Sequence, residues 1–349
     1  MINPLQADSS FKFVGAIISH AAQNCNQRLE LSGANVYNLR GGDVVLKKIF
    51  AIIICLMLTN IFTACGATQK EATNPVIKSF FAETVALNSG YTMPRFGFGT
   101  WTLNDDEADA LVWHALKIGY RLIDTAQYYG NEVGVGRAVR SAIKDGIATR
   151  EEIFVTSKIL PSSDPDAAIE KSIKNLNIGY VDLMLVHQPG YNDKETYRAL
   201  ERAVKAGKVR SIGISNYYTP QDFDRIRNAA QIVPAVVQNE NHIFYQNAEL
   251  KAYVAQFGTV VESWYPLGGR GNTQLVLGND TVKSLAEKYS KTPAQIVLRW
   301  QFQDGYIAIP GSKNRTHITE NFDIFNFRLT EEDMNLMREL NRNQRFENW

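Results

Sequence analysis

The stretch IFVTSKILPSSDPDAAIEKSIKNLNIGYVDLMLVH, residues 153–187, decides the fold class. It begins with an apolar, β-rich run at 153–158 and continues with a helical pattern of apolar residues at 166–176. A second apolar run follows at 181–187. A strand, a helix and a strand in this order form a unit with two parallel strands, because a parallel pair needs a long crossover connection.

The same alternation continues on both sides of this unit. Eight such units that close on themselves form an α/β fold, the (β/α)8 or TIM barrel. A short hairpin around Asn88-Ser89-Gly90, with segments 84–86 and 91–93, predicts a cap over the N-terminal end of the barrel. The interval before the last strand holds two helical patterns, so one helix is additional. The expected strands are 96–99, 121–124, 153–158, 181–187, 209–215, 235–238, 259–264 and 306–309, and the expected helices are 107–116, 132–143, 166–176, 195–206, 220–229, 248–256, 281–290 and 292–302.

A doubly wound sheet is the competing fold. It would normally carry the sequence GxGxxG after its first strand. The nearest match, Gly134-Val135-Gly136, lies inside a helical pattern and lacks the third glycine. These glycines are interpreted as helix-packing positions, and the barrel is favoured.

Composition excludes several classes of function. The chain has 349 residues, is 45% hydrophobic and 21% charged, and carries a net charge of +1 without a basic block, which argues against a nucleic-acid partner. Its three cysteines all lie in the first fifth of the chain, so disulfides and thiolate catalysis are excluded for the body. The five histidines lack metal-ligand spacing, and we expect no metal site.

The front of the chain has the pattern of a targeting segment. Lys47 and Lys48 precede an apolar stretch at 49–65, as in a secretory signal peptide. The stretch is short and interrupted for a membrane span, which needs about 20 apolar residues. Its ending, FTACG at 62–66, resembles a bacterial lipobox, and we therefore expect Cys65 to be the lipid anchor. A single uncleaved anchor helix is the alternative.

These features predict four segments. Residues 1–44 are expected to be an upstream extension from a misassigned start, without order, and 45–65 a lipoprotein-type signal peptide. Residues 66–81 form a linker, and 82–349 form the barrel. The expected location is the bacterial cell envelope, where the anchored domain faces the periplasm or cell surface. A cytoplasmic protein is expected if the signal is not used.

Four polar residues stand at or just beyond the ends of expected strands. Asp124 closes one apolar run, and Tyr129 follows five residues later, within GYRLIDTAQYYGNE at 119–132. Lys158 and His187 close two later runs. Because the C-terminal ends of barrel strands face one site, we expect the four side chains to converge.

This set of groups predicts a proton-donating site. A phenol has a reference pKa of about 10, so Tyr129 is protonated at neutral pH. An ammonium at Lys158, kept charged by Asp124, is expected to lower that pKa and make the phenol a better donor. A neutral His187 can orient a carbonyl oxygen. The site suits reduction of a carbonyl, with hydride arriving at carbon and the proton coming from Tyr129.

From about residue 85 to the C-terminus the chain resembles the aldo-keto reductases of the short bacterial type, which are similar to 2,5-diketo-gluconate reductase. The resemblance implies a catalytic tetrad of Asp124, Tyr129, Lys158 and His187. It also implies NAD(P)H-dependent reduction of an aldehyde or ketone to an alcohol. The matching stretches are GFGTW at 97–101, the segment at 119–132, VTSK at 155–158, LVH at 185–187, GISN at 213–216 and, more loosely, PAVVQNENH at 234–242 and WYPLG at 264–268.

The resemblance further implies a nicotinamide cofactor. In the family, a lysine in the IPKS motif and an arginine a few residues later favour NADPH over NADH. In this chain Gly311 replaces that lysine and His317 replaces that arginine. Lys313 and Arg315 lie close by, so NADPH stays the expected cofactor and NADH remains open. The implied cofactor contacts are Thr100, Ser215, Asn216, Gln238, Trp264, Leu267, Ser312, Lys313, Glu320 and Asn321.

The implied substrate pocket is lined by Trp101, Tyr129, His187 and Gln188. Gln188 stands where a tryptophan is common, which makes this wall more polar. The polar loops 102–106, 188–194 and 268–280, together with the tail at 345–349, hint at small polar carbonyls or sugars, but substrate identity stays open. We expect a monomer.

A second function is left open by the predicted export. Free NADPH is scarce outside the cytoplasm, which favours a membrane-tethered module that binds a nicotinamide cofactor with little or no turnover. The complete tetrad favours the enzyme, because a pure binding module does not need Tyr129.

Overall fold

The computed structural model describes residues 83–348. The segments predicted at 1–44, 45–65 and 66–81, and the lipidation of Cys65, lie outside the described residues. Within residues 83–348, no helix combines the length and apolar character needed to cross a membrane.

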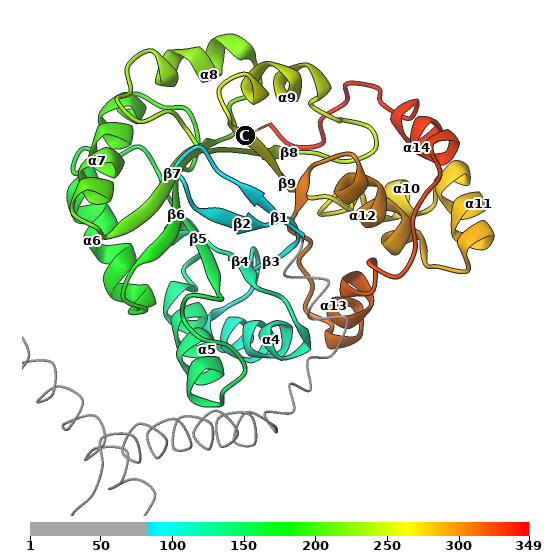
Figure 1. The fold of residues 1–349 in the computed structure, drawn as a ribbon, viewed down its shortest axis with the longest axis horizontal. Coiled ribbons are helices and arrows are strands. Elements are labelled where there is room, and N and C mark those ends of the chain that lie inside the picture. Colours follow the sequence, from blue (N-terminus) through cyan, green and yellow to red (C-terminus); the bar gives the residue numbers. More distant parts are fainter. Residues whose placement is uncertain (1–82, 349) are drawn as a thin grey trace, which may run out of the picture. The chain divides into compact units, whose positions relative to one another are not determined.

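Eight parallel strands form one continuous sheet in sequence order (Figure 1). Phe96, just before the first of them, makes a parallel bridge to Ala308 in the last, so the sheet closes on itself. The predicted (β/α)8 barrel is therefore confirmed, and each expected strand is present within a few residues of its predicted bounds. The strands are β3 (Gly97–Gly99), β4 (Leu122–Asp124), β5 (Phe154–Ile159), β6 (Val181–Val186), β7 (Val209–Ser215), β8 (Val236–Glu240), β9 (Val260–Trp264) and β10 (Ile307–Ala308).

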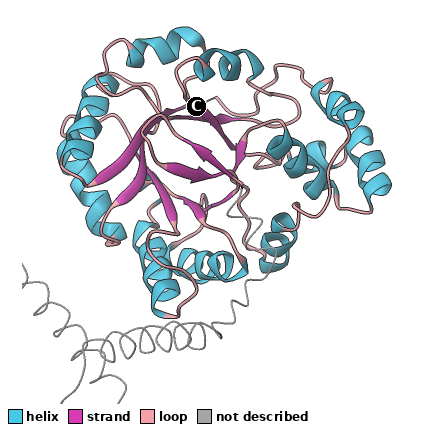
Figure 2. Ribbon diagram, viewed as in Figure 1, coloured by secondary structure: helices cyan, strands magenta, loops and turns pink. Residues whose placement is uncertain are grey.

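Helices surround the barrel on the outside (Figure 2). The additional helix predicted before the last strand is present, since both segments of that interval are helical. Three further helices were not predicted from the sequence, at 273–277, 315–322 and 331–338. The last of them begins with a capping box formed by Thr330 and Asp333. The helices are α4 (Asp105–Ile118), α5 (Glu132–Lys144), α6 (Pro165–Leu176), α7 (Asp193–Lys205), α8 (Pro220–Arg227), α9 (Ala248–Ala255), α10 (Thr273–Leu277), α11 (Asp280–Tyr289), α12 (Pro293–Gln303), α13 (Arg315–Phe322) and α14 (Glu331–Arg338), with a 3-10 turn η2 (Gln127–Tyr129).

The predicted hairpin caps the N-terminal end of the barrel. Its antiparallel strands are β1 (Thr84–Ala86) and β2 (Thr92–Pro94). Asn88 Nδ2 donates hydrogen bonds to the carbonyls of Pro234 and Phe257, which precede β8 and β9. Met93 is fully buried and packs with the apolar side chains at that end of the barrel.

The two glycines of α5 are packing positions, as interpreted from the sequence. A Cβ on Gly134 would lie 2.0 Å from the carbonyl oxygen of Asp105, at the start of α4. A Cβ on Gly136 would lie 2.0 Å from the carbonyl oxygen of Leu176, at the end of α6. Only glycine permits so close an approach of three helices.

The barrel interior changes from apolar to polar along the strands. Leu122, Leu183 and Val236 fill the N-terminal part. Asp124 and Gln238, two residues further along their strands and so on the same face, are also buried. Burial of such groups is costly unless they are paired, so the C-terminal end of the barrel is where function is expected.

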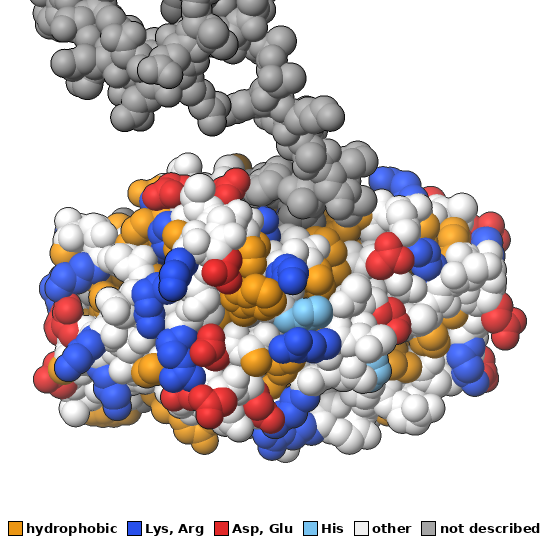
Figure 3. Space-filling model, turned by 90° about the horizontal axis from the view of Figure 1, so that it is seen from below, with side chains coloured by type: hydrophobic (Ala, Val, Ile, Leu, Met, Phe, Trp, Pro, Cys, Tyr) orange, Lys and Arg blue, Asp and Glu red, His pale blue; other side chains and the backbone are white. Residues whose placement is uncertain are grey.

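Charged side chains of both signs are interspersed on the face of the molecule shown in Figure 3. This face carries no extended patch of one sign, consistent with the net charge of +1. Among residues 83–348, no group of three or more His, Cys, Asp and Glu side chains could hold a metal ion.

Candidate active site

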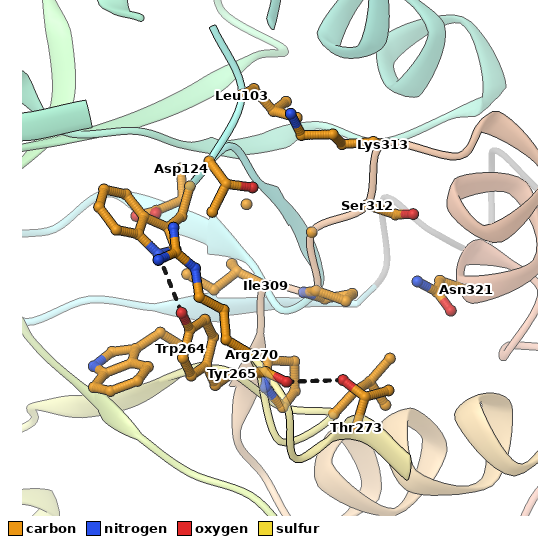
Figure 4. Close-up of a pocket in the computed structure, with 18 of the residues that line it drawn as sticks. Leu103, Asp124, Trp264, Tyr265, Arg270, Thr273, Ile309, Ser312, Lys313 and Asn321 are labelled. Atoms are coloured by element: carbon orange, nitrogen blue, oxygen red, sulfur yellow. Dashed lines mark hydrogen bonds between the residues drawn. The ribbon is translucent and has the colours of Figure 1, made fainter. Parts of the chain in front are cut away.

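A cavity of about 460 Å³ opens at the C-terminal end of the barrel (Figure 4). It runs from the strand ends near Asp124 and Trp264 to the segment of Ser312 and Asn321, as Figure 4 shows. Thr100, Lys158 and Gln188, which the resemblance placed in the site, do not line it. The other residues implied for cofactor, substrate or catalysis all do: Trp101, Asp124, Tyr129, His187, Ser215, Asn216, Gln238, Trp264, Leu267, Ser312, Lys313, Glu320 and Asn321.

The ammonium of Lys158 joins three of the polar groups. Lys158 is buried behind Tyr129, and its Nζ donates to Asp124 Oδ1 at 2.7 Å, to the Thr125 carbonyl at 2.9 Å and to Tyr129 Oη at 3.1 Å. An ammonium has three hydrogens, so these partners use its full capacity. Lys158 therefore contacts the cavity only through two residues that line it, Tyr129 and Asp124. Thr100 supports the backbone of Asp124, because its hydroxyl donates to the Asp124 carbonyl at 2.9 Å.

Both Lys158 and Tyr129 are protonated at neutral pH. Burial by itself lowers the pKa of the Lys158 ammonium, but Asp124 and Tyr129 outweigh burial and raise it to about 12. Burial also raises the pKa of the Tyr129 phenol to about 12, although Lys158 acts in the opposite direction. The expected net decrease of the phenol pKa is therefore wrong, because desolvation of the phenolate exceeds the effect of one ammonium.

A second buried carboxyl, Glu262, belongs to this cluster. Gln238 Nε2 donates to Asp124 Oδ2 at 2.8 Å and to Glu262 Oε2 at 2.7 Å. Burial raises the pKa of both acids, that of Glu262 to about 8 with Asp124 adding to the shift. Lys158 contacts Asp124 directly, so Asp124 is the carboxylate and Glu262 the neutral acid at pH 7. The sequence offered one signal, since Glu262 lies two residues before Trp264 on the same face of β9.

His187 is a neutral imidazole beside the phenol. It follows β6, and its ring centroid lies 5.7 Å from that of Tyr129. Burial, reinforced by the Lys158 ammonium, lowers the pKa of His187 to about 3. A neutral ring carries one N–H, so His187 can donate a single hydrogen bond to an oxygen in the cavity.

Aromatic side chains form the mouth of the cavity. Trp101 packs against Tyr129 with ring centroids 4.7 Å apart and stacks on Tyr128 at 6.0 Å. Its Nε1 donates to Tyr265 Oη at 3.1 Å, the bond drawn in Figure 4, and the Arg270 guanidinium lies 5.3 Å from its ring centroid. Tyr128 also lines the cavity, although the sequence offered no reason to assign it to the site. Arg270 belongs to the loop 268–280, which the sequence associated with the choice of substrate. Tyr265 and the contact of Arg270 with Trp101 were not predicted, because no motif indicated that the residues after β9 reach Trp101.

The end of the cavity near Trp264 holds both satisfied and free polar groups. Asn216 has a φ of 67°, donates to the His187 carbonyl at 2.8 Å and accepts from Trp264 Nε1 at 3.1 Å. The Ser215 hydroxyl is buried and has no hydrogen-bond partner within residues 83–348. Gln238 donates both amide hydrogens to carboxyl groups, so its side-chain carbonyl remains available as an acceptor. A free hydroxyl and a free carbonyl fit a carboxamide, the polar group of nicotinamide.

The opposite end combines a close backbone contact with an ion pair. A Cβ on Gly311 would lie 2.6 Å from the carbonyl oxygen of Gly99, so a lysine there would require the backbone to move. Lys313 lines the cavity, and its Nζ pairs with Glu107 at 2.8 Å. His317 also lines this end.

Comparisons with known proteins agree with this geometry. The model of the aldo/keto reductase family matches residues 95–342. Glyoxal reductase of Bacillus subtilis is 41% identical over 269 residues, which cover 75% of this chain and 94% of that protein. The NAD(P)H-dependent D-xylose reductase I,II of Candida tropicalis is 36% identical over 304 residues, with 75% and 94% covered.

A solved structure extends the agreement to the fold. The crystal structure of an aldo-keto reductase from Bombyx mori in complex with NADP is 32% identical, has a TM-score of 0.71 and covers 76% of this chain and 94% of its own. Family model, relatives and fold thus coincide over the barrel that carries the cavity. This chain belongs to the aldo/keto reductase family of NAD(P)H-dependent oxidoreductases.

Proposed function

We propose that this protein reduces an aldehyde or ketone to an alcohol, with Tyr129 as the proton donor. The observation that carries the proposal is the Lys158 ammonium, which hydrogen-bonds both Tyr129 Oη and Asp124 beneath the cavity. NADPH, when bound, supplies the hydride to the carbonyl carbon. The protein then has to hold the carbonyl oxygen and protonate it.

Each member of the tetrad has a separate part in that task. Neutral His187 donates a hydrogen bond to the substrate oxygen and orients it toward the phenol. Tyr129 gives its proton to that oxygen, and the resulting phenolate is stabilised by the ammonium of Lys158. Asp124 keeps Lys158 charged in its buried position. Trp101 walls the substrate pocket beside Tyr129, and Gln188 stays a predicted pocket residue although it lies outside the cavity lining.

The proposed cofactor site spans the length of the cavity. Ser215, Asn216 and Gln238 hold the carboxamide end, and Trp264 stacks on the nicotinamide ring. Leu267 and the segment with Ser312, Lys313, Glu320 and Asn321 hold the remainder, while Thr100 supports the site from beneath. NADPH is the proposed cofactor, because Lys313 and Arg315 supply positive charge near the position where the family's lysine is missing.

The proposed substrates are small polar carbonyl compounds, taken by a monomeric protein. Glyoxal and D-xylose, which the names of two relatives carry, belong to this class. The mouth formed by Trp101, Tyr128 and Arg270 offers both apolar and polar contacts to such molecules. A small aldehyde fits a cavity that must also hold the nicotinamide.

Oxidation of NADPH by the purified protein tests this function. We expect turnover with glyoxal-type dicarbonyls and aldose sugars, and higher kcat/KM with NADPH than with NADH. Initial rates with both cofactors across aldehydes, ketones and sugars measure it. Tight NADPH binding with no oxidation by any carbonyl would instead support a tethered cofactor-binding module.

We also propose that Cys65 anchors the protein to a membrane in the bacterial cell envelope, behind the signal peptide at 45–65. The lipobox-like ending at 62–66 supports it. Cys65→Ser is expected to move the protein from the membrane to the soluble fraction, because the site of lipid attachment is lost. Cys55→Ser, in the same apolar stretch, is the matched control and should leave the fractionation unchanged. Equal membrane association of the two variants would contradict lipidation.

A further inference from the structure

We infer that Glu262 is a positioning residue for the nicotinamide: it shares the amide hydrogens of Gln238 with Asp124 and so aims the Gln238 carbonyl into the cavity. The inference rests on the proposed cofactor site and adds a residue to it. Glu262 is fully buried on β9, paired in register with Gln238 on β8.

The orientation of the Gln238 amide follows from its neighbours. A side-chain amide has two hydrogens and one carbonyl oxygen. Its nitrogen lies 2.8 Å from Asp124 Oδ2 and 2.7 Å from Glu262 Oε2, so each hydrogen has an acceptor. The reverse orientation would put the amide oxygen against the ionised Asp124, which is repulsive. The carbonyl is thereby left for the cavity, which Gln238 lines.

The two acceptors are not redundant. Without Glu262, Asp124 would accept only one of the two amide hydrogens of Gln238. The second hydrogen would then be buried without an acceptor, or the amide would rotate to find one. An unsatisfied buried donor is costly, so the rotated state would compete with the orientation that accepts from a carboxamide. Glu262 removes that competition, and it does so through its hydrogen bond with Gln238, because Glu262 does not itself line the cavity.

Cofactor binding without turnover tests the inference. Glu262→Met keeps the length of the side chain and removes the acceptor, and is expected to weaken NADP⁺ binding by about threefold to tenfold, the value of one ordinary hydrogen bond. Glu262→Gln keeps an acceptor oxygen and should restore affinity to within about twofold of the original protein. Quenching of tryptophan fluorescence gives the dissociation constants, and thermal unfolding shows that each variant is folded.

A probe without nicotinamide separates positioning from general damage. Adenosine 2′,5′-bisphosphate occupies only the end near Ser312 and Asn321, and its affinity should be the same in Glu262→Met as in the original protein. Weaker binding of both ligands would show a structural defect and overturn the inference. So would Glu262→Gln binding NADP⁺ as poorly as Glu262→Met.

A double-mutant cycle tests whether Glu262 acts through Gln238. If Glu262 acts through Gln238, then Gln238→Met combined with Glu262→Met should bind NADP⁺ no worse than Gln238→Met alone. Additive losses would show that Glu262 acts independently and would overturn the inference. Failure of the unmutated protein to bind NADPH or NADP⁺ would instead overturn the proposed cofactor site itself.

Discussion

Tyr129→Phe is expected to lower kcat for carbonyl reduction by about a hundredfold to ten-thousandfold, the usual contribution of a positioned general acid. The substitution removes only the phenolic oxygen, which is the one donor of the site that lines the cavity and also contacts the Lys158 ammonium at 3.1 Å. His187 cannot replace it as an acid, because burial lowers the pKa of that ring to about 3. Steady-state kinetics with saturating NADPH measures the loss.

The neighbouring Tyr128 provides a matched control. Tyr128 lines the mouth of the same cavity but is 56% exposed and stacks on Trp101. Tyr128→Phe keeps the ring and should change kcat by less than about threefold, since no proton is taken from it. NADPH affinity should stay unchanged in both variants. Equal kcat in Tyr129→Phe and the original protein would remove Tyr129 from the mechanism.

Much of this site could be predicted because its residues occupy strand ends. Asp124, Lys158 and His187 each close an apolar run, and closure of the barrel brings such ends together whatever the loops do. Tyr129 was found by its motif, five residues beyond Asp124. These positions depend on the local apolar pattern and on the topology of the fold, and both can be inferred from the order of residues in the sequence.

Other features depend on contacts that no local pattern encodes. The meeting of Arg270 with Trp101 is a property of a loop conformation. The direction of the Tyr129 pKa shift follows from the balance of burial against one ammonium, and only a three-dimensional structure gives the burial. The short helices α10, α13 and α14 lack a long apolar periodicity, so their caps were weak signals beside the barrel helices. Glu262 became significant only through its contact with Gln238.

Lys158→Met is expected to lower the free energy of unfolding by about 3–5 kcal/mol and to abolish detectable reduction. The stability loss arises because Asp124 stays buried with its carboxylate and no counter-charge. Asp124→Asn combined with Lys158→Met removes both charges, and should recover most of the stability while leaving the enzyme inactive. Urea unfolding measured beside kinetics separates the two effects. Recovery of activity in the double variant would contradict the requirement for the ammonium.

The pH dependence of that stability gives an independent check. Burial raises the pKa of Asp124 in the folded protein, and loss of Lys158 removes the strongest opposing influence. The pKa of this carboxyl is higher in the folded protein than in the unfolded chain, where it is about 4. Its contribution to stability is therefore fully present below about pH 4 and is lost as the pH rises through the pKa of the folded protein. The urea midpoint of Lys158→Met should therefore lie closer to that of the original protein at acidic pH than at neutral pH. Asp124→Asn removes this carboxyl from the double variant, which should therefore lack the additional loss of urea midpoint that Lys158→Met shows between acidic and neutral pH. An equal change of midpoint with pH in the two variants would mean that the ammonium does not hold Asp124 in its ionised form.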